Sequence, residues 1–68
     1  MIIEFNDMFI NLNAVGYIKR LFAGTRHRIA VFMREGGLMV EFLYDSESER
    51  DLDYKILSET IRNSKLYT

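Results

Sequence analysis

The change of hydrophobic pattern at Asp45 constrains the fold of this chain more than any other feature. Before it, short apolar runs rich in β-branched and aromatic residues alternate with Asn, Asp and Gly, which is typical of strands and turns. After it comes SESERDLDYKILSETIRNSK (46–65), in which Ser46 and Glu49 form a capping-box signature that predicts the start of a helix. Strands followed by one helix indicate the α+β class.

Two glycine-containing turns predict a three-stranded meander. RIAVFMR (28–34) and LMVEFLY (38–44) flank EGG, where Gly36 and Gly37 can supply the positive φ that such turns require. The loop AGTRH (23–27) would join GYIKRLF (16–22) to that hairpin in the same way.

The first residues of the chain predict a further hairpin. MIIEF (1–5) and MFINL (8–12) flank the turn ND, and Asn11 and Asn13 then predict a break or bulge. We expect an antiparallel sheet of about four to five strands with this hairpin at its edge. The C-terminal helix packs on one face, within a single small α+β domain over residues 1–68.

The small size of the chain favours association with another subunit. A chain of 68 residues buries only about 60% of the surface that its unfolded form exposes. Small domains usually compensate with disulfides, a metal or a partner, but this sequence has no cysteine and His27 is its only histidine. No metal-ligand spacing is present, so we expect no metal or cofactor and favour a partner subunit.

We expect a cytoplasmic protein that does not enter a membrane. No apolar run approaches the roughly 20 residues that span a bilayer, and MIIEFNDMF has acids where a signal peptide carries bases. The absence of cysteine fits a reducing compartment. The overall pattern resembles that of many small bacterial and phage proteins, although no motif in it specifies a family.

The alternation of apolar residues leaves a second apolar surface beyond the predicted core. Phe32, Met39 and Leu43 fall on the sheet face opposite Ile29, Val31 and Phe42. On the helix, Leu52 and Ile56 lie well round from the stripe of Tyr54, Leu57 and Ile61. These five are candidate interface residues for a homodimer or a larger protein. The alternative is that sheet curvature or the first hairpin covers them, or that they are ordinary scattered exposed residues.

Charge is divided between the two halves of the sequence. The segment from Met8 to Arg34 has five basic residues and no acid, whereas residues 35–68 have four bases against eight acids, a net charge of −4. The basic residues are Lys19, Arg20, Arg26, Arg28 and Arg34. With Tyr17, Phe22 and Phe32 between them, they are candidate contacts for nucleic acid or for an acidic partner. Alternatively they keep a loop solvated, or they pair with the acidic half within one chain or across a dimer.

No catalytic signature stands out. The glycines belong to short turns rather than to a phosphate-binding loop, and a lone histidine in an arginine-rich loop is seldom catalytic. We therefore expect a non-enzymatic protein-interaction module that dimerises and acts as an adaptor or inhibitor of a larger protein. The alternative is a nucleic-acid-binding module that uses the basic hairpin around residues 19–34.

Overall fold

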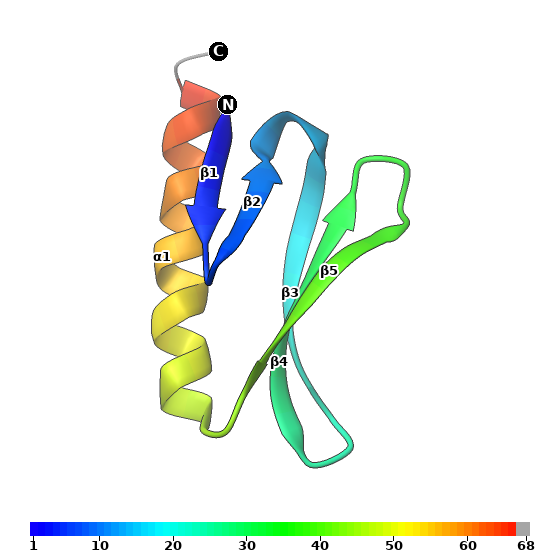
Figure 1. Ribbon diagram of the computed structural model, residues 1–68, viewed down its shortest axis with the longest axis vertical. Helices are drawn as coiled ribbons and strands as arrows, with labels where there is room; N and C mark the ends of the chain where they lie inside the picture. The colour runs from blue at the N-terminus through cyan, green and yellow to red at the C-terminus, as the bar shows by residue number, and fades with distance from the viewer. Residues whose placement is uncertain (67–68) are drawn as a thin grey trace.

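The computed structural model describes residues 1–66, which fold into two antiparallel sheets and one long helix (Figure 1). The elements are β1 (Ile2–Phe5), β2 (Met8–Asn11), the 3-10 helix η1 (Leu12–Ala14), β3 (Val15–Ala23), β4 (Arg26–Met33), β5 (Leu38–Tyr44) and α1 (Glu47–Leu66). β1 pairs with β2, and the order β3–β4–β5 forms the second sheet. The α+β class and the meander are confirmed. The five strands, however, form two sheets rather than the single four-to-five-stranded sheet predicted.

Local turn geometry separates the first hairpin from the meander. Asn6 and Asp7 have φ values of 49° and 63°, so the two-residue turn is of the tight kind that closes a hairpin. Beyond β2, the Asn11 side chain accepts a hydrogen bond from the backbone N–H of Asn13 (3.0 Å), and η1 follows. The predicted break is therefore a 3-10 turn. It redirects the chain, and β2 does not pair with β3.

The start of the helix follows the predicted cap. Ser46 Oγ accepts a hydrogen bond from the backbone N–H of Glu49 (3.2 Å), which satisfies one of the free amides of the first turn. Glu47 and Glu49 place carboxylates at the positive end of the helix dipole. The positive φ expected in the turns is confirmed at Gly24 (+66°) and Gly36 (+101°), whereas Gly37 does not adopt it.

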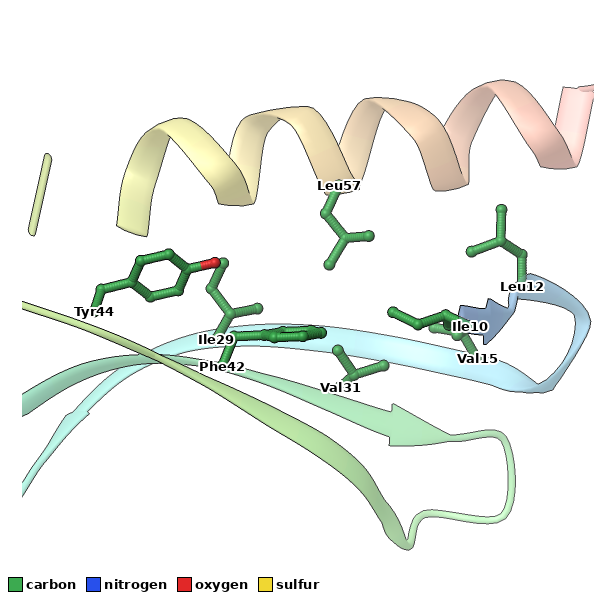
Figure 2. Close-up of a cluster of buried hydrophobic side chains, with 8 residues drawn as sticks. All are labelled: Ile10, Leu12, Val15, Ile29, Val31, Phe42, Tyr44 and Leu57. Carbon is green, nitrogen blue, oxygen red and sulfur yellow. The ribbon is translucent and has the colours of Figure 1, made fainter. Parts of the chain in front are cut away.

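The core lies between α1 and one face of the three-stranded sheet, which we call the inner face (Figure 2). Leu57 points from the helix toward Ile29 and Phe42 of the sheet, and the first hairpin closes the core through Ile10. The buried apolar cluster consists of Ile10, Leu12, Val15, Ile29, Val31, Phe42, Tyr44 and Leu57. The hairpin also packs through Phe5, whose ring meets Phe42 edge-on at 5.1 Å.

A partly buried hydrogen-bond network joins the first hairpin, β5 and α1. The Tyr44 hydroxyl donates to Asp53 Oδ2 (2.8 Å), and Asn6 Nδ2 donates to the same hydroxyl (2.9 Å) and to Asp53 (3.3 Å). The position of Asp53 in the helix suggests only a role in solubility, so the sequence pattern does not reveal this contact. Burial, followed by the hydrogen bond to Asp53 and its negative charge, raises the pKa of the Tyr44 hydroxyl well above its usual value.

This network predicts a loss of stability in alkali. The folded state keeps the Tyr44 proton while an unfolded tyrosine ionises near pH 10, so the stabilisation is complete below about pH 10 and falls above it. The free energy of unfolding should fall by up to about 1.4 kcal/mol per pH unit from this group alone. Urea unfolding of the wild type and Tyr44→Phe between pH 8 and pH 12 measures it, because all other groups are shared. Equal slopes for the two chains would contradict the prediction.

Candidate interaction surface

The face of the three-stranded sheet turned away from α1 carries residues predicted from strand alternation. Helix α1 covers the inner face only (Figure 2). We define the outer face by residues from all three strands: Tyr17, Lys19, Leu21, Arg28, Ala30, Phe32, Leu38, Glu41 and Leu43. Leu43 keeps 50% of its surface exposed and Tyr17 keeps 44%. The outer face therefore presents apolar side chains on the side that the helix leaves uncovered.

An aromatic pair dominates one end of the outer face. Tyr17 and Phe32 are cross-strand partners, and their rings stack with centroids 4.6 Å apart and planes inclined by 13°. Lys19 Nζ lies 5.7 Å from the centroid of the Tyr17 ring. Phe32 is half-buried and held by this contact, so it offers a preordered ring rather than a mobile one.

A charge pair crosses the other part of the outer face. Arg28 Nη1 donates to Glu41 Oε1 at 3.0 Å, and Arg28 Nε donates to the Ala23 carbonyl at 3.3 Å. The two charged side chains are 27% and 31% exposed, so water screens the pair only partly. Leu43 is the cross-strand partner of Arg28 and Leu21 is its partner on the other side. Polar and apolar groups are thus interleaved.

The other candidate interface residues do not join this face. Met39 is half-buried and packs against the core cluster, because the pairing of β4 with β5 shifts between Val31 and Phe32 and breaks the simple alternation. Leu52 (61% exposed) and Ile56 are exposed on α1, across the core from the outer face. An interface between two outer faces therefore cannot also contain Leu52 and Ile56.

The first hairpin exposes apolar residues that are not among the candidates from the sequence. Phe9 is 75% exposed, and Ile2 is exposed on the neighbouring strand. The alternation of β2, in which Ile10 is buried between the exposed Phe9 and Asn11, is the sequence signal that could have predicted the exposure of Phe9. A strand expected only to form a sheet edge therefore has one buried side and one exposed side of its own.

Three of the five basic candidates are already paired with acids of the same chain. Arg20 lies 3.6 Å from Asp51, Arg26 lies 3.8 Å from Asp45, and Arg28 pairs with Glu41. Arg20 also lies 4.8 Å from the centroid of the Tyr54 ring. Among the described residues, Lys19 and Arg34 make no ion pair. The basic segment and the acidic half therefore meet within one chain, which reduces the charge that a nucleic acid would encounter.

Arg50 links the helix to β3, a role that no pattern in the sequence predicts. It is one of the few buried charged residues, and its Nη1 donates to the Leu21 carbonyl at 3.2 Å. Its guanidinium also lies 3.0 Å from Asp51, the carboxylate that Arg20 approaches. This arginine therefore satisfies a backbone carbonyl of β3, an edge strand of the sheet whose free side has no neighbouring strand.

His27 in β4 lies beside an aromatic residue of β3. Its ring packs on Phe22 with centroids 4.7 Å apart, and its buried Nδ1 has no hydrogen-bond partner among the described residues. Among residues 1–66, no group of three or more His, Cys, Asp or Glu side chains could hold a metal ion. An open depression of about 400 Å³ lies elsewhere, lined by Val15, Gly16, Tyr17 and Arg34.

The most prominent functional candidate is therefore the outer face, which combines an aromatic stack, a charge pair and exposed leucines. Within residues 1–66, no helix is long and apolar enough to cross a membrane. Comparison with protein-family models, with curated proteins and with solved structures gives no significant match, so the geometry alone carries the functional argument.

Proposed function

We propose that this chain is a cytoplasmic, non-enzymatic protein-interaction module that forms a homodimer through its outer face and acts as an adaptor or inhibitor of a larger protein. One observation carries the proposal: the Tyr17–Phe32 stack and Leu43 lie on a sheet face that α1 leaves uncovered. Aromatic residues are enriched at the centres of protein interfaces, and stacked rings lose little entropy when a partner covers them.

The size of the face sets the expected strength of the dimer. Three strands spaced by about 4.8 Å give a narrow patch, at or below the low end of the area that specific interfaces bury. We therefore expect a dissociation constant on the order of micromolar, equivalent to about 8 kcal/mol.

A dimer formed in this way leaves a second apolar region for a larger partner. Ile2 and Phe9 on the first hairpin, and Leu52 and Ile56 on α1, belong to elements on the inner side of the three-stranded sheet. They would stay accessible while the outer faces are covered. An adaptor needs such a second surface, and these residues are the candidates for it.

The experiment that tests the proposal is sedimentation equilibrium of the wild-type chain from about 0.05 µM to about 1 mM, a range that brackets the expected dissociation constant. The mass should rise from that of one chain to that of two. A mass of one chain across the whole range would refute dimerisation.

Nucleic-acid binding is the competing function and has a separate outcome. Fluorescence anisotropy of labelled single- and double-stranded oligonucleotides at low salt would reveal it, with an affinity that falls steeply as salt rises. Loss of that binding in Lys19→Glu and Arg34→Glu would assign it to the two basic candidates that make no ion pair among the described residues. The ion pairs of Arg20, Arg26 and Arg28 lead us to expect no binding.

A further inference from the structure

The outer face is built from three rows of side chains that cross the strands, each with a β4 residue at its centre. The rows are Tyr17–Phe32–Leu38, Lys19–Ala30–Glu41 and Leu21–Arg28–Leu43. The middle row has a cation at one end and an anion at the other, and the last row has a leucine at both ends. The middle and last rows of one copy are therefore each complementary to the same row of a second copy when that row runs in the opposite direction.

Two copies that pack face to face as a symmetric dimer must be related by a two-fold axis lying between the sheets. If that axis is parallel to β4, it reverses every row, so Lys19 of each copy faces Glu41 of the other. If the axis runs across the strands at the middle row, Lys19 faces Lys19 and Glu41 faces Glu41. Like charges placed opposite one another disfavour the second arrangement.

The residues on the axis itself do not oppose this arrangement. Ala30 is 1% exposed and is flanked in its row by Lys19 and Glu41, so it presents almost no surface of its own to a second copy. Arg28 of one copy would face Arg28 of the other. In each copy, however, the guanidinium already donates to Glu41 at 3.0 Å and to the Ala23 carbonyl at 3.3 Å. Its charge is balanced within the chain, so the repulsion between the two copies is reduced.

We infer that the dimer has a two-fold axis parallel to β4, with Lys19 of each copy paired to Glu41 of the other and Leu21 packed on Leu43 of the other. This inference rests on the proposed homodimer and specifies its geometry. Glu41 then accepts from Arg28 in its own chain and from Lys19 of the second copy. Sheets that pack in this way are about 10 Å apart, with their strands nearly aligned.

Mixed cross-linking tests the axis, because the sequence has no cysteine of its own. Leu21→Cys and Leu43→Cys are prepared separately, mixed, and treated with a short bismaleimide. Under the proposed axis the thiol at position 21 faces the thiol at position 43 of the other copy, while like positions are offset sideways by two strand spacings, about 9.6 Å. We expect at least about fivefold more cross-linked dimer from the mixture than from either variant alone. Phe9→Cys mixed with Leu43→Cys is the control, because Phe9 lies on the first hairpin.

A charge reversal gives an independent readout of the same axis. Lys19→Glu should weaken the dimer at least about fivefold, since it places two carboxylates opposite each other at both ends of the middle row. With the axis across the strands, it would only exchange a Lys–Lys contact for a Glu–Glu contact. A wild-type dimer with no preferential cross-link between positions 21 and 43, or with an unchanged Lys19→Glu affinity, overturns the axis while the homodimer stands. A wild-type chain that stays monomeric overturns both.

Discussion

Replacement of Leu57 by alanine is expected to lower the free energy of unfolding by about 3 kcal/mol, within the usual range for a buried leucine. Leu57 is 1% exposed and is a fully buried apolar residue that α1 places against the sheet (Figure 2). Removing its side chain opens a cavity between Ile29, Phe42 and the helix. A domain of this size has only a few kcal/mol of stability to lose, so the variant should be partly unfolded at room temperature.

The matched control for this prediction is Leu52→Ala. It makes the same chemical change in the same helix at a side chain that is 61% exposed, so it should alter stability by no more than about 0.5 kcal/mol. Urea unfolding followed by circular dichroism measures both variants. Equal losses for Leu57 and Leu52 would show that the helix does not use the predicted face.

Replacement of Phe32 by glutamate is expected to weaken the dimer by about 100-fold or more, which corresponds to roughly 3 kcal/mol. Phe32 lies in the centre strand of the outer face and stacks on Tyr17, so the change removes the aromatic pair and buries a carboxylate in the interface. Sedimentation equilibrium measures the dissociation constant, and circular dichroism checks that the variant is folded.

Two further variants make the Phe32 result decisive. Phe9→Glu introduces the same charge at the most exposed phenylalanine, on the first hairpin, and should leave the dimer unchanged. Leu43→Glu places a charge on the outer face at a half-exposed position, so it should lower the free energy of unfolding only slightly. It should weaken the dimer at least about tenfold. A dimer weakened by Phe9→Glu and unaffected by Leu43→Glu would move the interface to the hairpin.

Local signals in the sequence were sufficient for the helix and the turns. The hydrogen bond from the Glu49 amide to Ser46, and the positive φ of Gly24 and Gly36, depend on residues a few positions apart. The position of the first hairpin against β5 and α1 depends instead on long-range contacts, such as that of Asn6 with Tyr44 and Asp53. The hydrophobic periodicity of a sequence does not predict contacts between residues 38 and 47 positions apart.

The candidate interface was only partly predictable for the same reason. Strand alternation located Phe32 and Leu43 on the outer face, but it misplaced Met39 because one irregular pairing beside Phe32 shifts the register. The charge count showed that the two halves are complementary. It could not show that Arg20, Arg26 and Arg28 would find their acids within one chain, since that depends on how the strands and helix are placed.

The most direct test of the central claim, that the outer face is where two copies meet, is a dilution series followed by nuclear magnetic resonance. The backbone amide signals of Tyr17, Ala30, Phe32 and Leu43 and the methyl signals of Leu43 should shift with concentration, while the amide signals of Phe9 and Leu52 should stay constant. Concentration-dependent shifts confined to the first hairpin or to α1, or a chain that stays monomeric without shifts up to about 1 mM, would contradict the claim.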